Sequence, residues 1–381
     1  MSQDAIAVVG EPTVTVRRPA WVPDPRVVVL MVASGILEYF DTIHSPRPFR
    51  LPYPLPLQMA LDRLTLFSWH TGAAPPIGVV ELLGWATIPF GDWPVDLEDA
   101  DVDLDESLVR YGRPTATCEE LGTLRGDIEG EVRENSLIRA VMDKARAAAS
   151  PEAYVAFRRL LIERPAITAL ELDHALTRPE LAVLAEELRR SYVGVPPEAE
   201  AEGVVRTCAG CHGLCLPVDG RTWMCADPSC PAPAASGPCY PAAEGIYWLR
   251  RELRTFIVAP GRAELRIAEA IENRGVAVRL WPDYDACDLS VFDDSRPWVA
   301  DVKAWRNPVR LAHRLRDRPF EPPNNAERAY IVVAGEQLKG QPDYLARLHR
   351  ACPQVGPGQR VEAVTEPEFI KLVSLRGRSR A

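Results

Sequence analysis

The sequence predicts a multidomain protein with an α-helical N-terminal region, a cysteine-rich metal-binding module in the centre and an α/β domain at the C-terminus. Three observations carry this prediction. Apolar runs separated by proline-containing breaks dominate the first half, six of the nine cysteines lie between Cys208 and Cys239, and three strand-like segments follow an amphipathic helix after residue 260. The 381 residues are enough for roughly two or three domains.

The composition is that of a folded protein outside the membrane. Hydrophobic residues make up 47% and charged residues 25%, which excludes a chain that is disordered throughout. The longest apolar run, from Val27 to Leu37, is shorter than the ~20 residues that span a bilayer. Asp4 stands where a signal peptide would carry basic residues. We therefore expect a cytoplasmic protein with no membrane partner.

The charge is unevenly distributed along the chain. The net charge is −9, yet residues 241–381 hold 23 basic and 19 acidic side chains. Contacts with the phosphates of a nucleic acid are therefore expected in the C-terminal part. Only four of the 44 basic residues are lysines, so a lysine beside acidic residues stands out.

The N-terminal part divides into an arm and a helical domain. Residues 1–25 lack apolar periodicity and are predicted to be a disordered arm, whereas residues 26–200 are predicted to form a helical domain. An acidic stretch from Asp96 to Glu106 is expected to be a solvated loop. A Pro/Glu/Ala-rich linker from Val193 to Gly203 marks the boundary that follows.

Capping signals place two helices near the end of this domain. Ser150 is expected to cap a helix that begins at Pro151, and Thr177 and Glu180 have the spacing of a capping box for a second helix. The segment around residues 165–192 also allows a helix-turn-helix of a transcription-type regulator. This segment lacks the basic residues that such a motif needs, which favours ordinary helix packing.

The central cysteines have the spacing of a metal site. Cys208 and Cys211 form a C-x2-C pair, and Cys225 and Cys230 form a C-x4-C pair on the far side of a short hairpin. Four soft sulfur ligands on two tight turns suit the tetrahedral coordination of Zn²⁺. The predicted module at residues 204–240 is therefore similar to a zinc ribbon.

The expected role of this zinc is structural. A site closed by four protein ligands leaves no coordination position for a water molecule, and catalytic zinc needs one. The choice of ligands stays open at this point, because His212, Cys215 or Cys239 could replace one of the four cysteines.

The C-terminal residues 241–381 are predicted to form the α/β domain. The predicted elements, in order, are a helix at residues 262–273, strands at 276–281, 288–292 and 298–305, a basic helix at 309–318 and a strand at 329–335. The turn between the second and third strands joins them as a hairpin. The order is therefore a helix, a β-meander, a helix and a strand.

Two aspartates and a lysine fall on neighbouring strands of this meander. Side chains alternate along a strand, so Asp301 and Lys303 point to the same face, and Asp288 opens the neighbouring hairpin strand. Two carboxylates are suitable ligands for Mg²⁺, and a lysine beside the metal can orient a water molecule or stabilise charge that builds on phosphorus. This set of groups is suited to phosphodiester hydrolysis.

The arrangement resembles the restriction-endonuclease-like PD-(D/E)xK nuclease superfamily, over about residues 250–335. The resemblance implies that Asp288 and Asp301 are the metal-binding acids, that Lys303 is the catalytic lysine and that Glu264 is a supplementary acid on the first helix. No proline stands directly before Asp288, which departs from the motif and leaves Asp285 as a rival for the first acid.

A more specific resemblance joins the three parts of the chain. A helical N-terminal region, a zinc ribbon and a C-terminal nuclease of this type are similar to the restriction-endonuclease-like protein associated with prokaryotic PIWI-RE proteins. That resemblance implies a defence system against mobile or foreign DNA, with a PIWI-like protein and a helicase as partners.

The sequence thus predicts a metal-dependent DNA endonuclease that holds Mg²⁺ at Asp288 and Asp301, with RNA or a hybrid as other substrates to be considered. Four arginines of the basic stretch are candidates to grip the nucleic-acid backbone: Arg306, Arg310, Arg314 and Arg316. The rival interpretation is a non-catalytic adaptor whose zinc ribbon binds a nucleic acid or a protein.

Overall fold

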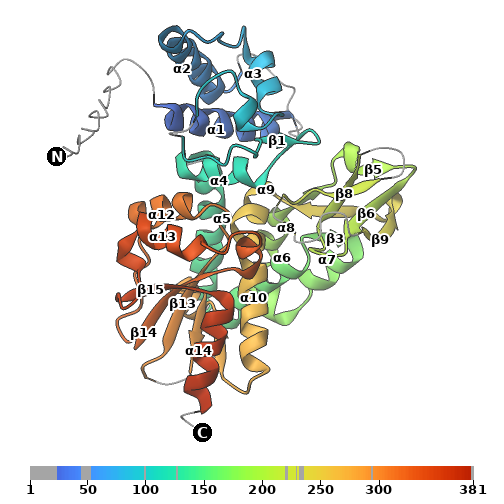
Figure 1. The fold of residues 1–381 in the computed structure, drawn as a ribbon. Helices are drawn as coiled ribbons and strands as arrows, with labels where there is room; N and C mark the ends of the chain where they lie inside the picture. The colour runs from blue at the N-terminus through green and yellow to red at the C-terminus, as the bar shows by residue number, and fades with distance from the viewer. Residues whose placement is uncertain are drawn as a thin grey trace, which may run out of the picture.

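The computed structural model describes residues 24–43, 53–97, 100–125, 128–218, 222–228, 230, 236–292 and 295–378. It has an N-terminal helical unit, a small cysteine-rich sheet region on one side and a C-terminal α/β unit at the opposite end (Figure 1). Of the arm predicted at residues 1–25, residues 1–23 lie outside the described part of the chain.

The N-terminal unit has its own hydrophobic core. Its elements are α1 (Pro25–Ile43), α2 (Leu55–Thr71), α3 (Val79–Trp85), η1 (Phe90–Asp92), β1 (Val109–Arg110), β2 (Arg113–Pro114) and α4 (Ala116–Arg125). The core runs from Val28 to Leu121 along the chain and includes Phe90 and Trp93, whose ring centroids are 5.3 Å apart. Gly35 lets α2 approach α1, because a Cβ at this position would lie 2.5 Å from Leu57.

A second core crosses the predicted domain boundaries. It combines elements before and after the cysteine module: α5 (Ile128–Ala147), α6 (Pro151–Glu163), β3 (Ala166–Thr168), α7 (Ala169–Leu176), η3 (Pro179–Leu184), α8 (Ala185–Ser191), β4 (Tyr192–Gly194), β10 (Ile246–Leu249), α9 (Arg251–Leu253) and η6 (Arg254–Val258). Strand β10 lies between β3 and β4. Buried Trp281 of the C-terminal unit also belongs to this core, so α6 packs directly against that unit.

The capping box predicted at Thr177 is wrong. The structure has the capping box nine residues earlier, where the Thr168 side chain accepts a hydrogen bond from the Glu171 backbone and Glu171 bonds back to Thr168. Thr177 instead ends α7, and its hydroxyl donates to the His174 carbonyl. The helix at Pro151 does begin where predicted, although the Ser150 side chain makes no capping hydrogen bond.

The cysteine-rich part is an antiparallel sheet. It contains η4 (Pro197–Ala199), β5 (Glu200–Ala201), β6 (Val204–Cys208), β7 (Leu214–Pro217), β8 (Trp223–Cys225), β9 (Ser236–Pro241) and η5 (Ala242–Glu244). The strand order is β5-β6-β7-β8, and β9 pairs with β6. Cys215 is opposite Cys225 in the pairing of β7 with β8, so the hairpin expected between the two cysteine pairs is present.

The C-terminal elements occur in the order that the sequence predicts. They are α10 (Ala259–Glu272), β11 (Val278–Leu280), α11 (Pro282–Asp285), β12 (Leu289–Val291), β13 (Trp298–Lys303), α12 (Pro308–Asp317) and β14 (Arg328–Val333), followed by η7 (Gly335–Leu338), α13 (Tyr344–Ala351), η8 (Pro353–Val355), β15 (Val361–Thr365) and α14 (Glu366–Arg378). The sheet order is β11-β12-β13-β14-β15. The first three strands are antiparallel, whereas β13, β14 and β15 are parallel.

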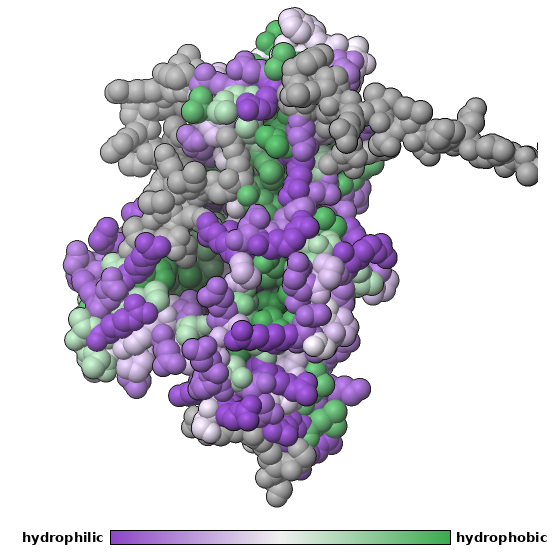
Figure 2. Space-filling view, turned by 90° about the vertical axis from the view of Figure 1, so that its left-hand side faces the viewer, coloured by the Kyte–Doolittle hydropathy of each residue, from purple (hydrophilic) through white to green (hydrophobic). Residues whose placement is uncertain are grey.

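Helices cover both faces of this sheet. Helices α10 and α14 pack on the face that carries Val302 and Tyr330, and α12 and α13 pack on the face that carries Ile331 and Val333 (Figure 1). On the side of the molecule where α12 and α13 lie, hydrophilic side chains cover most of the coloured surface (Figure 2). Among the described residues, no helix combines the length and apolar character needed to cross a membrane.

Candidate functional site

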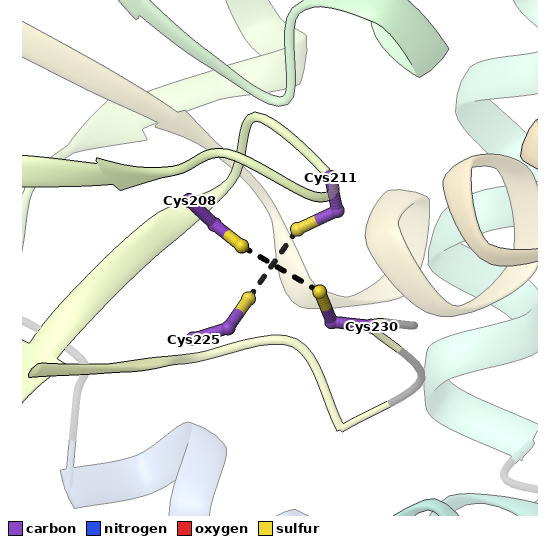
Figure 3. A group of neighbouring side chains, drawn as sticks. All are labelled: Cys208, Cys211, Cys225 and Cys230. Carbon is purple, nitrogen blue, oxygen red and sulfur yellow. Dashed lines mark hydrogen bonds between the residues drawn. The ribbon is translucent and has the colours of Figure 1, made fainter. Parts of the chain in front are cut away.

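The four cysteines of the two predicted pairs converge. Their sulfur atoms all lie within 4.8 Å of one another, and the loops that carry them face each other across a small space (Figure 3). The Sγ atoms are 3.5 Å apart for Cys208 and Cys230 and 3.3 Å apart for Cys211 and Cys225, too far for a disulfide and close to the ~3.8 Å that Zn–S bonds of about 2.3 Å imply. The predicted cysteine cluster is confirmed, and its donor set fits a zinc ion.

The alternative ligands are arranged differently. Among the described residues, the only group of metal-ligand side chains this close together is Cys208, Cys211, Cys225 and Cys230. Cys239 is exposed on β9, and Cys215 lies on β7. A hydrogen bond from Cys225 lowers the pKa of Cys208 to about 6, so this sulfur is available as the thiolate that zinc binds.

Asp288, Asp301 and Lys303 come together at the ends of two paired strands. Leu289 is opposite Ala300 in the pairing of β12 with β13, so Asp288, directly before Leu289, and Asp301, directly after Ala300, lie at the same end of this pair. One carboxylate oxygen of Asp288 accepts a hydrogen bond from the Val302 backbone nitrogen at 2.6 Å. The Lys303 ammonium donates to Asp301 Oδ1 at 2.8 Å.

A buried arginine that sequence reasoning missed lies beside these acids. Arg158 of α6 donates to both carboxylate oxygens of Glu264, at 3.2 and 3.1 Å, although 106 residues separate the two in the chain. The guanidinium is also 2.5 Å from Asp285 and 3.7 Å from Asp288, and its carbon lies 4.8 Å from the centroid of the Trp281 ring. Both Arg158 and Glu264 are buried, so this contact joins α6 to the acidic site.

The sequence does contain a signal for Arg158. It lies on the face of α6 that also buries Tyr154 and Leu161, four residues before it and three residues after it. A charged side chain on the apolar face of a helix needs a buried partner of opposite charge. The sequence does not show where this partner is.

The loop before Asp288 is conformationally strained. Trp281, Asp283, Tyr284 and Asp285 all have positive φ angles, between 47° and 78°. Residues other than glycine rarely adopt this left-handed region, at a cost of about 1–3 kcal/mol each, and such residues cluster at functional sites. Contacts hold the loop in place, because the Trp281 indole donates to Glu264 and Arg158 pairs with Asp285.

Burial and mutual repulsion shift the pKa values of the site. Burial, then the neighbouring Glu264 and Asp301 carboxylates, raise the pKa of Asp288 well above its ordinary value. Burial likewise raises the pKa of Glu264, although Arg158 opposes this shift. Burial lowers the pKa of Lys303, but Asp301 and Asp288 outweigh it and the net shift is upward, so Lys303 stays charged.

The four arginines proposed to grip a nucleic acid have different environments. Arg310 is 1% exposed and pairs with Glu106 at 3.1 Å and with Glu120 at 3.2 Å, so the structure excludes it from a surface that meets phosphates. Part of the acidic stretch expected to be solvated therefore covers the basic helix instead. The other three arginines are exposed or half-buried, and Arg306 and Arg314 line a cavity beside Lys303.

Two family models match the chain, on either side of the cysteine-rich part. Residues 261–381 match a family described as "REase associating with pPIWI_RE", and residues 28–168 match one described as "pPIWI_RE three-gene island domain Y". No curated protein and no solved structure was found to match the chain. The first match contains Asp288, Asp301 and Lys303, and the second contains Arg158. The chain therefore contains a region that matches the pPIWI_RE-associated REase family and a region that matches domain Y, and the two regions meet at the acidic site.

Proposed function

We propose that this protein is a metal-dependent DNA endonuclease that hydrolyses phosphodiester bonds, with Asp288, Asp301 and Lys303 as its central groups. The observation that supports the proposal is the pairing of β12 with β13, since Asp288 and Asp301 flank the same end of the Leu289–Ala300 pair and Lys303 bonds to Asp301. The match of residues 261–381 to an REase-associated family supports it.

The chemistry of the acidic site fits one divalent cation. When ionised, Glu264, Asp285, Asp288 and Asp301 bring four negative charges, and Arg158 and Lys303 bring two positive ones. One oxygen of Asp285 is buried and has no hydrogen-bond partner among the described residues. Asp288 and Asp301 would hold Mg²⁺, which supplies Lewis-acid polarisation of the scissile phosphate and of a water molecule.

The remaining groups of the site position and balance these acids. The Val302 backbone fixes one oxygen of Asp288, and Asp301 fixes the Lys303 ammonium at the C-terminal end of β13. Because Lys303 stays protonated, it can stabilise negative charge on a phosphate but cannot accept a proton from water. Glu264 and Arg158 bond to each other in the interior. They hold the loop before Asp288 through Trp281 and Asp285.

A plasmid-nicking assay tests this function. The zinc-loaded protein is expected to cut DNA with added Mg²⁺ or Mn²⁺ and to be inactive without them. Lys303→Ala and Asp301→Asn should each reduce the rate by about 100-fold or more at unchanged folding. Lys371→Ala, which removes an exposed lysine of α14, is the matched control and should cut normally. Equal cutting by all four proteins would contradict the proposal.

The setting proposed for this activity is a defence system against mobile or foreign DNA. Both matched family descriptions refer to pPIWI_RE, which supports a PIWI-like partner. A helicase partner and a cytoplasmic location are part of the same proposal. The rival function, a non-catalytic adaptor built on the cysteine module, predicts that Lys303→Ala leaves every activity unchanged.

A further inference from the structure

A cavity of about 540 Å³ adjoins Lys303 where the parts of the chain meet. Its walls come from α4 and β2 of the N-terminal unit, from η6, from the segment after β13 and from four residues of the cysteine-rich part: Ala226, Asp227, Pro228 and Cys230. No single part of the protein could form it. Lys303 is one of its lining residues, so a ligand in the cavity would lie beside this side chain.

The lining of this cavity is positively charged in a protein of net charge −9. Seven basic and four acidic residues line it, and two of the four lysines in the chain, Lys303 and Lys339, are among them. Arg113 of β2 is half-buried in the wall, and its side chain forms no hydrogen bond or ion pair within the part of the chain that the structure describes. Burial lowers the pKa of this guanidinium. The Glu198 carboxylate offsets only part of this pKa shift, so a polyanion in the cavity would add counter-charge.

Aromatic side chains add a second feature. Phe256 and Trp305 are half-buried and line the cavity from η6 and from the segment that follows β13. Residues 254–258 form a π-helix between α9 and α10, a rare conformation that occurs frequently at functional sites. A basic groove that also carries aromatic rings is typical of proteins that bind single-stranded nucleic acids, because bases stack on the rings while cations contact the phosphates.

We propose that this cavity binds an unpaired segment of a nucleic-acid strand, with bases on Phe256 and Trp305 and phosphates near Arg113 and Lys339. The inference rests on the proposed nuclease function and adds its substrate class. A cavity of this volume is of the size that accepts a small ligand, so an intact duplex does not enter it. The scissile segment therefore reaches Lys303 as a single strand or after leaving its complement.

Binding without cleavage tests this inference. Fluorescence anisotropy of the full zinc-loaded protein, with no Mg²⁺ added, is measured with labelled oligothymidylate, with oligouridylate and with the matching DNA duplex. We expect at least one single strand to bind about 10-fold more tightly than the duplex, and the better of the two identifies DNA or RNA as the ligand. Equal or tighter binding of the duplex would overturn the inference.

Two variants test the cavity itself. The plot of log affinity against log salt concentration has a negative slope. Arg113→Ala/Lys339→Ala should reduce the magnitude of this slope by about 1.4, at about 0.7 for each lost phosphate contact. Phe256→Ala should weaken binding by about 5- to 150-fold. Arg350→Ala/Lys371→Ala removes the same charges from exposed sites outside the cavity and should leave the slope unchanged. An unchanged slope in Arg113→Ala/Lys339→Ala would overturn the inference.

The two proposals fail in different ways. A protein that binds single strands through Arg113 and Lys339 but never cuts would contradict the nuclease function alone. A protein that cuts duplex DNA through Asp301 and Lys303 without preferring a single strand would contradict the cavity inference alone.

Discussion

The cysteine cluster and the carboxylate cluster assemble in opposite ways. The four cysteines come from one stretch, residues 208–230, and their sulfurs approach one another closely enough to share an ion. The carboxylates come from α10, from the loop before β12 and from β13, and cations already lie among them: Arg158 bonds to Glu264, and Lys303 bonds to Asp301.

The two sites should therefore hold a metal ion in different ways. The cysteine site is closed and soft, so it should hold zinc permanently as part of the fold. The carboxylate site is partly neutralised by Arg158 and Lys303, so the Mg²⁺ proposed for it should exchange readily. We expect zinc to remain through purification and Mg²⁺ to need to be added.

The largest expected effect is the loss of a zinc ligand. Cys211→Ser should remove the zinc, about one per chain, and unfold the module at residues 204–240, because structural zinc contributes about 10–16 kcal/mol in zinc-finger peptides. Metal analysis and limited proteolysis measure the two effects. Cys239→Ser, at an exposed cysteine outside the cluster, is the control and should keep its zinc. Loss of zinc from Cys239→Ser would mean that the ligand set differs.

Removal of the internal cation tests the carboxylate side of the comparison. Arg158→Met should lower the free energy of unfolding by about 3–5 kcal/mol, because it leaves Glu264 buried without its charge partner. Urea denaturation measures the change. Arg159→Met is the matched control: the neighbouring arginine is half-exposed, lies 3.6 Å from Glu163 and should contribute under about 1 kcal/mol. Similar losses in both variants would show that Arg158 has no special role.

The same contrast explains which features of the two sites could be predicted from the sequence. The cysteine cluster was predictable because two short spacings and one hairpin determine it locally, although the sequence left His212, Cys215 and Cys239 open as alternative ligands. It was also predictable that Asp301 and Lys303 share a face of the sheet, because side chains alternate along a strand. These inferences use neighbours in sequence or in an adjacent strand.

Contacts between distant parts of the chain were not predictable. The basic character of α12 suggested phosphate contacts, but the partners of Arg310 are Glu106 and Glu120, which come from the N-terminal unit about 200 residues earlier. The error at Thr177 has a local cause. Thr168 and Glu171 have the same capping spacing, and burial of Leu172 and Ala175 favours the earlier helix start.

One ion pair connects the two regions, and breaking it should have a moderate effect. Arg262, in the first turn of α10, bonds to Asp227 beside the cysteine cluster at 2.7 Å, and both side chains are largely buried. Asp227→Asn should lower the free energy of unfolding by about 1.5–3 kcal/mol, the value of a hydrogen bond to a charged group. Urea denaturation again measures it. Asp143→Asn breaks the exposed pair with Arg146, which is 3.7 Å long, and should change stability little.

The smallest expected effect is a dependence on pH, and it separates a buried carboxylate from an exposed one. Burial and then Glu264 raise the pKa of Asp288 above its ordinary value of 3.8. Between the pKa of the unfolded state and the raised pKa of the native state, the native state holds more protons than the unfolded state and gains stability as the pH falls. Asp288→Asn removes the buried charge, so without added Mg²⁺ the variant should be more stable than the unsubstituted protein at about pH 7. This difference in stability should shrink as the pH falls to about pH 5, as measured by thermal unfolding.

Glu180 provides a control of opposite sign for this measurement. A backbone hydrogen bond and then Arg178 lower the pKa of Glu180 below 4.5, so its charged form stabilises the native state and this contribution disappears only as the pH falls through that lowered pKa. The stability difference between Glu180→Gln and the native protein should thus stay constant from about pH 7 to about pH 5. If Asp288→Asn behaved in the same way, Asp288 would be ionised throughout, and its charge would already be balanced by Arg158 alone.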